Sequence, residues 1–340
     1  MNAKMKAVLI GAFGHFGNPL KEIAEGDTAR LAACAPAYPG EDMKRVAKIA
    51  ESAGADLYED YRAMLAREMP DIAIVSTRMD RIAPTAIDAA SAGCHLICEK
   101  PLAIDCDSLE ALYRTVKKNN VQLIGMLSMR SHAAFHAARE VYRSGKLGEL
   151  AVANARKSYG WGTRPDWFGE RAAYGGTIPW IGIHALDMIH FITGLRFKRV
   201  AAMHANLGHP DRPQCEDACA LSLELANGAL ASISVDYFRP ETAPSHGDDW
   251  ARIVGSKGVL EANATRRACE TIIRGEEPAT LPLGGEVKIY ASFLSALAEH
   301  KTCGDIQAPG DAFMLTYACL KAREAADTGR VLEIEDRDWD

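Results

Sequence analysis

The sequence predicts an α/β protein: an N-terminal doubly wound parallel sheet, followed by a C-terminal α+β domain with a large, mostly antiparallel open sheet. In residues 1–126, short apolar runs alternate with segments of helical spacing, the order that a doubly wound sheet requires. Beyond residue 127 the β-like runs are longer, and Asn227-Gly228 marks a hairpin between two of them. The 340 residues fit two domains. We therefore expect domains at 1–126 and 127–340, with the last helix able to pack back on the first domain.

The first domain is expected to alternate strands and helices from its start. Its strands are continuous apolar runs, the pattern of parallel strands that are buried on both faces. We expect strands at 6–10, 31–35, 72–76, 95–98 and 122–126, and helices at 18–25, 43–53, 60–68, 84–92 and 108–119. Gly93, directly after the fourth helix, is a typical stop signal.

The second domain is expected to combine a sheet with flanking helices. We expect helices at 132–144, 289–300 and 310–327, and strands at 151–158, 200–205, 218–225, 229–238, 251–255 and 331–334. The glycines at both ends of 255–258 indicate a further turn. Consecutive strands of this kind favour an antiparallel sheet.

Composition and charge exclude several classes of protein. The net charge is −6, whereas proteins that work by binding nucleic acid phosphates need a basic surface. No apolar run approaches the roughly 18 residues of a membrane span. The nine cysteines include no CxxC pair, which indicates free thiols in a reducing compartment rather than a metal site. We expect a cytoplasmic protein with no nucleic acid partner, no membrane segment and no bound metal.

A glycine-rich loop follows the first predicted strand and opens a helix. Its glycines, Gly11, Gly14 and Gly17, have the spacing GxxGxxG, with Phe13 where the common GxGxxG motif has its second glycine. In dinucleotide folds such glycines let backbone N–H groups approach a pyrophosphate at the helix N-terminus. The loop therefore indicates a dinucleotide site, and a tight turn without a ligand is the alternative.

The end of the second predicted strand carries no acid for the ribose hydroxyls. Dinucleotide folds usually place Asp or Glu there. In this chain Pro36 follows the strand, the first acid is Glu41, and the basic Lys44 and Arg45 come still later. The choice between NAD and NADP is therefore left open.

Two further motifs make the chain resemble a known family. Residues 92–101 read AGCHLICEKP, and residues 175–187 read GGTIPWIGIHALD. With the glycine loop, these motifs resemble the glucose–fructose oxidoreductase / inositol dehydrogenase / rhizopine catabolism (Gfo/Idh/MocA) family. The resemblance implies an N-terminal Rossmann domain that binds NAD or NADP, and a C-terminal sheet domain that often forms oligomer interfaces. It also implies oxidation or reduction of a sugar or cyclitol carbon. We accordingly expect a small polyhydroxy substrate and a homodimer or homotetramer.

The resemblance gives two residues direct roles in such a reaction. In the family pattern, the lysine of EKP, Lys100, lies at the substrate hydroxyl, and the histidine of GxHxxD, His184, transfers the proton. The chemistry of the residues agrees, because loss of a hydride requires a proton acceptor and imidazole titrates near neutrality. Lys100 can stabilise the developing alkoxide, or act as base if burial lowers its pKa. A surface lysine and a core histidine are the alternatives.

Asp187 lies three residues after His184, on the same face if this segment is helical. We expect it to bind substrate or to orient the imidazole, and a structural role is the alternative. His190 lies about 600° from His184 around such a helix, so the three residues do not predict a metal site.

The resemblance also implies which residues contact the cofactor. They are Gly11, Phe13, Gly14, His15, Phe16, Pro36, Thr77, Arg78, Glu99 and Lys100.

Three positions depart from the family pattern. Trp180 stands where the family usually has an Asp that works with the lysine and the histidine. Tryptophan cannot accept a proton, but it can stack against a sugar ring or close a pocket. The segment Thr77-Arg78-Met79-Asp80 replaces the usual Thr-Pro-Asn, and Pro36 is the third departure. The departures indicate a divergent subgroup with altered chemistry or cofactor use.

A polar and aromatic segment precedes the histidine motif. Tyr159, Trp161, Arg164 and Trp167 offer ring faces for a sugar and a guanidinium for a carboxylate or phosphate. We expect Tyr159, Arg164 and Trp167 to bind substrate, together with Trp180. Packing of these aromatic residues between domains is the alternative.

Three functions follow as hypotheses from these residues. The leading one is an NAD(P)-dependent oxidoreductase that transfers hydride between nicotinamide and a carbon of a sugar, cyclitol or related compound. The second is elimination, hydrolysis or epimerisation, with tightly bound recycling NAD or with none. The third is a non-catalytic ligand-binding or partner subunit, because fold and function can separate.

Overall fold

The computed structural model describes residues 4–304 and 306–339. The chain forms two compact units. The first unit contains Met1–Met126, Lys288–Thr316 and Asp338–Asp340, and the second contains Leu127–Val287 and Tyr317–Arg337. No helix in the described part of the chain is both long and apolar enough to cross a membrane.

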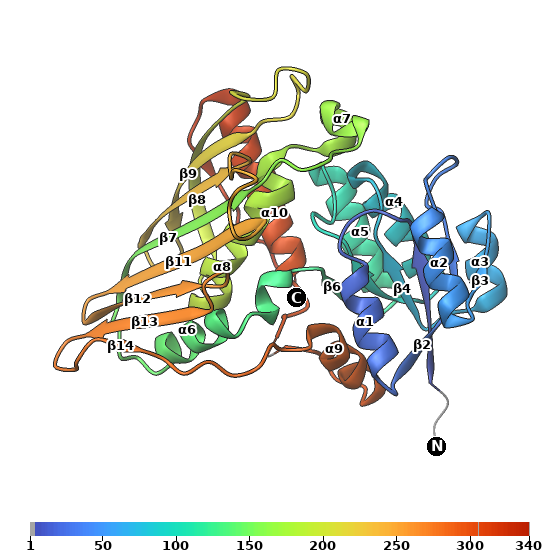
Figure 1. Cartoon of the computed structure of the whole chain (residues 1–340), viewed down its shortest axis with the longest axis horizontal. Helices are drawn as coiled ribbons and strands as arrows, with labels where there is room; N and C mark the ends of the chain where they lie inside the picture. Colours follow the sequence, from blue (N-terminus) through green and yellow to red (C-terminus); the bar gives the residue numbers. More distant parts are fainter. Residues whose placement is uncertain (1–3, 305, 340) are drawn as a thin grey trace. The chain divides into compact units, whose positions relative to one another are not determined.

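The first unit is built on a six-stranded parallel sheet with the order β3-β2-β1-β4-β5-β6 (Figure 1). The strands are β1 (Met5–Ile10), β2 (Ala29–Ala35), β3 (Asp56–Leu57), β4 (Ile72–Val75), β5 (His95–Cys98) and β6 (Leu123–Gly125). The last four residues of β1 and all of β4 are buried, as their apolar sequences predict. The strand order reverses at β1, and open α/β sheets bind ligands beside such a switch point.

Among the residues that the structure describes, six helices lie wholly in the first unit: α1 (Gly17–Glu25), α2 (Lys44–Ala53), α3 (Tyr61–Glu68), α4 (Met79–Ser91), α5 (Cys106–Lys118) and α9 (Ile289–Ala298). α4 begins five residues before the predicted start and contains Pro84 in its interior. Its first turns bury Met79, Ile82 and Ala83, and this apolar packing outweighs the loss of one backbone hydrogen bond.

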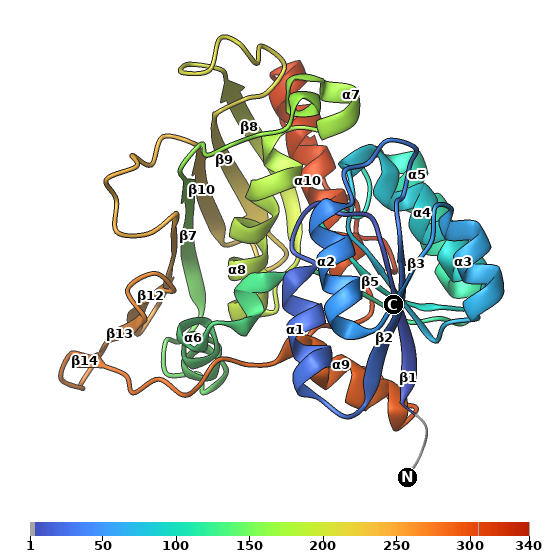
Figure 2. The same cartoon turned by 45° about the vertical axis from the view of Figure 1, so that its right-hand side comes forward.

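The first unit extends beyond residue 126 because α9 packs beside α1 (Figures 1 and 2). The carboxylate of Glu22 accepts the backbone N–H groups of Tyr290 and Ala291 at 2.9 and 2.8 Å. These N–H groups lie in the first turn of α9, where no helical carbonyl is available to them. Glu22 therefore caps a helix that follows it by more than 260 residues.

The second unit is built on a nine-stranded sheet with the order β14-β13-β12-β11-β7-β10-β9-β8-β15. Its strands are β7 (Leu150–Tyr159), β8 (Phe197–Ala205), β9 (Ala218–Leu225), β10 (Leu230–Asp236), β11 (Gly247–Gly255), β12 (Gly258–Asn263), β13 (Ala268–Ile273), β14 (Ala279–Thr280) and β15 (Leu332–Glu333). β7 and β10 are parallel, and the other neighbouring pairs are antiparallel. The predicted α/β architecture with a mostly antiparallel second sheet is confirmed. The predicted hairpin turn lies between β9 and β10, where Gly228 has a φ of +85°.

Helices cover one face of this second sheet. α6 (Ala133–Arg143) and α8 (Ile183–Thr193) pack against each other and against the sheet (Figure 2). α8 contacts β7, β10 and β11, and ten of its residues are buried. A short helix, α7 (Arg171–Tyr174), and a π-helical turn, Ile178–Gly182, precede α8. α10 (Asp311–Thr328) runs from the first unit into the second.

We predict that Glu22→Ala lowers the free energy of unfolding by about 1 kcal/mol, the usual cost of losing a helix cap. Urea unfolding followed by circular dichroism measures the change. Lys21→Ala, at the neighbouring exposed position, is the control and should change stability by less than about 0.5 kcal/mol. Equal stability of the two variants would contradict a capping role for Glu22.

Candidate active site

In the first unit, the candidate site lies at the carboxyl ends of the parallel strands. The predicted cofactor residues follow β1 (Gly11 to Phe16), β2 (Pro36), β4 (Thr77 and Arg78) and β5 (Glu99 and Lys100). Because the carboxyl ends of parallel strands lie at one edge, the fold gathers these residues there.

The glycine loop packs tightly against the ends of two strands. Gly11 and Gly14 have φ angles of +97° and +100°, which favour glycine. A Cβ on Gly11 would lie 2.5 Å from the carbonyl oxygen of Ser76, and a Cβ on Gly14 would overlap the carboxylate of Glu99. The two glycines are therefore required by backbone conformation and by close approach. Phe13, in place of the motif's second glycine, donates its N–H to the Ser76 carbonyl at 3.0 Å.

Glu99 binds the glycine loop from the end of β5. Its fully buried carboxylate accepts the backbone N–H of His15 at 2.5 Å and lies 2.9 Å from the Nδ1 atom of that residue. Burial would raise the pKa of Glu99, but the interactions with His15 and Lys100 outweigh burial and hold the pKa below its ordinary value. An ionised Glu99 thus links the loop to Lys100, which is buried and precedes Pro101 through a cis peptide bond.

Glu41 is a site residue that the sequence pattern did not identify. Its carboxylate accepts the N–H of Ala12 at 3.1 Å, the N–H of Ala37 at 2.7 Å and the hydroxyl of Thr77 at 2.7 Å. These three partners follow β1, β2 and β4, so the carboxylate lies at the switch point. Burial raises the pKa of Glu41, and the three hydrogen bonds oppose this rise. An acid at this place is what a dinucleotide fold uses for ribose hydroxyls.

The sequence pattern did not identify Glu41 because the loop between β2 and this residue is longer than usual. Glu41 follows the end of β2 by six residues, whereas the usual acid stands at the strand end. Gly40, with a φ of +85°, lets the chain turn back toward the sheet. Beside this turn, the guanidinium of Arg78 lies 5.0 Å from the ring of Tyr38 and pairs with Asp80 at 2.6 and 2.9 Å.

These observations fit a nicotinamide dinucleotide. The loop has the left-handed glycines and the helix N-terminus that a pyrophosphate requires. The end of β2 itself carries no acid, but the carboxylate of Glu41 lies close to it. Thr77 is buried and touches Glu41, so it belongs to the same cluster of residues.

In the second unit, the candidate residues lie on α8 and on the turn before it. His184 and Asp187 are fully buried in the first two turns of α8. One oxygen of Asp187 accepts both Nε and Nη2 of Arg130, at 2.9 and 2.6 Å. Arg130 lies in the 3₁₀ turn Ser128–Ser131 and is itself buried. The ion pair therefore fixes the first half of α8 to the turn that opens this unit.

Arg130 was missed because its significance depends on a partner 57 residues away. A lone arginine before a helix carries no local signal. Lys157 and Asp249 were missed for the same reason: they form a second buried ion pair, between β7 and β11.

Trp180 is buried in the π-helical turn, four residues before His184. Its indole lies edge-on to the ring of Phe168, with a centroid distance of 6.2 Å. Near this turn the hydroxyl of Tyr174 lies 2.9 Å from both Thr177 Oγ1 and the hydroxyl of Tyr237. Burial raises the pKa of both tyrosines far above the ordinary value, so both phenols stay neutral.

The structure separates the residues of the polar and aromatic segment. Arg164 lies over the rings of Tyr237 and Phe168, at 4.8 and 5.3 Å. Trp167 packs on Phe168 at 4.6 Å. Tyr159, at the end of β7, has the ammonium of Lys157 4.7 Å from its ring centroid. Arg164 and Trp167 thus share the cluster around Phe168, whereas Tyr159 belongs to the neighbourhood of the Lys157 ion pair.

Comparison with protein families gives two matches that together span most of the chain. Residues 5–126 match the model described as an oxidoreductase family with an NAD-binding Rossmann fold. Residues 135–261 match the GFO/IDH/MocA C-terminal domain.

Individual proteins with similar sequences or structures are also known. A solved structure from Thermotoga maritima, described as an oxidoreductase, has 33% sequence identity and a TM-score of 0.91, and covers 97% of this chain and 100% of that chain. Levoglucosan dehydrogenase in complex with NADH and L-sorbose has 19% identity and a TM-score of 0.85, covering 98% of this chain and 100% of that chain, which shows the shared fold. Inositol 2-dehydrogenase of Rhizobium meliloti is 27% identical over 278 residues, covering 81% of this chain and 80% of that protein.

Other curated relatives match over less of their length. The chain spans 59%, 49% and 59% of two uncharacterised oxidoreductases and a levoglucosan dehydrogenase, from Streptococcus pneumoniae, Synechocystis and Pseudarthrobacter phenanthrenivorans.

We predict that Arg130→Met lowers the free energy of unfolding by about 3 kcal/mol or more, because it leaves the buried carboxylate of Asp187 without its guanidinium. The double variant Arg130→Met/Asp187→Leu should recover most of this loss, because no buried charge is left unpaired. Urea unfolding of the two variants and the parent measures both effects. A double variant no more stable than the single one would show that the side chains act independently.

Proposed function

Because the chain belongs to the Gfo/Idh/MocA oxidoreductase family, we propose that it is an NAD-dependent dehydrogenase acting on a carbon of a sugar, cyclitol or related polyhydroxy compound. One observation carries the proposal: the switch point of the parallel sheet joins a left-handed glycine loop, Glu41 and the Glu99–Lys100 segment. This arrangement supports a dinucleotide site. Glu99, which contacts the glycine loop, directly precedes the buried Lys100.

The residues of the first unit would hold the cofactor. The backbone of the glycine loop would face the pyrophosphate, and Glu41 would accept the ribose hydroxyls. When bound, NAD accepts a hydride from the substrate carbon, or NADH returns one. Glu99 keeps the loop in place from its inner side, because its carboxylate holds the backbone N–H of His15.

Lys100 and His184 handle the substrate oxygen and its proton in this proposal. As the hydride leaves, the substrate hydroxyl becomes a carbonyl and must lose its proton. An imidazole nitrogen of His184 accepts this proton. The ammonium of Lys100 stabilises the negative charge that develops on the oxygen. In the reverse direction the protonated imidazole returns the proton to the alkoxide.

Asp187 positions the histidine helix rather than taking the proton. Its ion pair with Arg130 fixes the start of α8. The usual acid four residues before the histidine is replaced by Trp180. His184 is therefore assigned the role of proton acceptor without that acid.

Trp180 also favours a second candidate, a reaction with no net redox change. With Trp180 in place of the acid, this turn holds one proton acceptor fewer than the family pattern has. A tightly held NAD that is reduced and reoxidised within one cycle, during elimination or epimerisation, is compatible with this arrangement. Cofactor that copurifies and does not exchange with added NADH would favour this candidate over a dehydrogenase.

We predict that His184→Asn lowers the turnover of any accepted sugar or cyclitol by 10²–10⁴-fold, the usual contribution of a general base. Its NADH affinity, measured by the fluorescence of bound nicotinamide, should stay within about threefold of the parent, because His184 belongs to the second unit. Lys100→Met should lower turnover by a similar factor. A parent protein that fails to bind NAD(H) or NADP(H) at millimolar concentration would refute the proposal.

We further predict that the protein prefers NAD to NADP by about tenfold or more, because the carboxylate of Glu41 repels a 2′-phosphate. Glu41→Ser should weaken NADH binding and reduce the ratio of the affinity for NADH to the affinity for NADPH. Asp42→Asn, the adjacent exposed acid, removes the same charge from the surface and is the control. Dissociation constants for NADH and NADPH measured by fluorescence decide the matter. Equal effects of the two substitutions would contradict a specific role for Glu41.

A further inference from the structure

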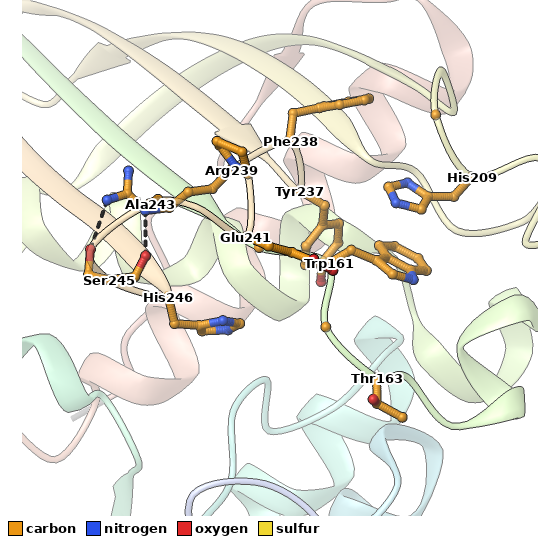
Figure 3. Close-up of a pocket in the computed structure, with 14 residues that line it drawn as sticks. Trp161, Thr163, His209, Tyr237, Phe238, Arg239, Glu241, Ala243, Ser245 and His246 are labelled. Carbon is orange, nitrogen blue, oxygen red and sulfur yellow. Dashed lines mark hydrogen bonds between the residues drawn. The ribbon is translucent and has the colours of Figure 1, made fainter.

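The second unit contains a pocket of about 700 Å³ whose lining residues have no role in the proposed function (Figure 3). Three loops form it: residues 160–163 after β7, 208–209 after β8, and 237–246 between β10 and β11. Its volume falls in the range of pockets that bind small molecules, about 300–1,000 Å³. Its lining combines three aromatic rings with hydroxyl, imidazole, guanidinium and carboxylate groups.

One wall of this pocket is a fixed aromatic surface. The indole of Trp161 stacks on the ring of His209 at a centroid distance of 3.6 Å and meets Tyr237 edge-on at 5.2 Å. Asp217 holds His209 in turn, with Oδ2 lying 2.9 Å from Nδ1, and also accepts the N–H groups of Leu207 and Gly208. The indole is therefore held in position before any ligand binds, which suits it to receive one face of a sugar ring.

Arg164 lies next to this wall: it packs on two of the lining rings, although it is not itself a lining residue. Its guanidinium lies 4.8 Å from the ring of Tyr237 and 5.9 Å from that of Trp161, two of the lining rings. Within the described part of the chain, Arg164 forms no ion pair, and its buried Nε atom makes no hydrogen bond. By contrast, the nearby Arg212 pairs with Asp166 at 3.1 Å, and Arg239 donates to Ser245 at 2.7 and 2.8 Å.

An arginine held among aromatic rings retains its charge and its donors. A carboxylate of a ligand would neutralise this charge and accept hydrogen bonds from these donors, because a guanidinium and a carboxylate form two parallel hydrogen bonds. Glu241 also lines the pocket, but it is an exposed side chain of the 237–246 loop and does not pair with Arg164. A phosphate also pairs with a guanidinium, but it carries a charge of about −1.5 to −2 near pH 7, which one guanidinium does not neutralise.

Arg164 is also connected to the turn before His184. The guanidinium covers Phe168 at 5.3 Å, and Phe168 contacts the indole of Trp180. Arg164, Phe168 and Trp180 therefore form a continuous series of contacts that ends four residues before His184.

We propose that the substrate is a sugar acid, whose carboxylate pairs with Arg164 and whose ring lies against Trp161. This inference rests on the proposed function, since it names the class of polyhydroxy substrate that the dehydrogenase takes. His209 and His246 provide hydrogen bonds to the ring hydroxyls. Burial, together with the charges of Arg164 and Lys157, lowers the pKa of His246, so its imidazole is neutral near pH 7.

The test compares acids with matched neutral compounds on the full-length protein. Isothermal titration calorimetry with NADH present measures the binding of D-glucuronate, D-galacturonate and D-gluconate, and of D-glucose, D-galactose and D-glucitol. D-glucose 6-phosphate is included as the phosphate arm. We expect at least one acid to bind tenfold or more tightly than its neutral counterpart, and high salt to reduce this difference.

Variants of Arg164 show whether this residue causes the preference. Arg164→Gln should reduce the preference for the acid over its neutral counterpart to threefold or less. Arg164→Lys should retain part of it, because the charge remains and the paired hydrogen bonds are lost. Arg156→Gln is the matched control: Arg156 also lies over an indole, that of Trp250, but already pairs with Asp248 at 2.8 Å.

Three outcomes would overturn the inference: no acid binds better than its neutral counterpart, the preference survives in Arg164→Gln, or the phosphate binds more tightly than every carboxylate. Failure of the proposed function is a separate result, because NADH binding by the parent protein is measured without any acid or sugar present. A protein that binds NADH and oxidises neutral sugars with no preference for acids keeps the proposed function and loses this inference.

Discussion

The close approach of the glycine loop to the ends of β4 and β5 is the constraint on which the candidate cofactor site depends. Gly11 and Gly14 have backbone conformations that favour glycine, and any side chain there would meet Ser76 or Glu99. The buried carboxylate of Glu99 then holds the loop through His15. The same few contacts therefore fix the loop and place Lys100 directly beyond it.

The second unit uses a buried ion pair for an equivalent purpose. Arg130 and Asp187 fix α8 to the turn at 128–131, and this places His184 on a rigid element. Buried pairs of this kind contribute little net stability, since the cost of desolvation offsets the attraction. In the proposed function, the Arg130–Asp187 pair serves to hold α8 in one arrangement, which a proton-transfer group at His184 requires.

At one of the positions where the chain departs from its family pattern, a residue from elsewhere in the chain supplies the missing functional group. The acid expected at the end of β2 is absent from the strand, yet Glu41 returns to the same place through a turn at Gly40. Trp180 is a different case, because no proton acceptor replaces the lost acid at that position. Under the proposed function, Glu41 thus replaces the acid of the cofactor site, whereas proton transfer is assigned to His184.

The sequence by itself determined the parallel sheet, the glycine positions and the two motifs that carry Lys100 and His184. These features are local, because apolar runs, left-handed turns and short spacings depend only on residues that are close together in the sequence. Tertiary structure alone decided the roles of Glu41 and Arg130 and the return of residues 288–316 to the first unit. Each of these depends on partners that are distant in the chain, and no local pattern encodes which distant groups will satisfy a buried charge or a helix end.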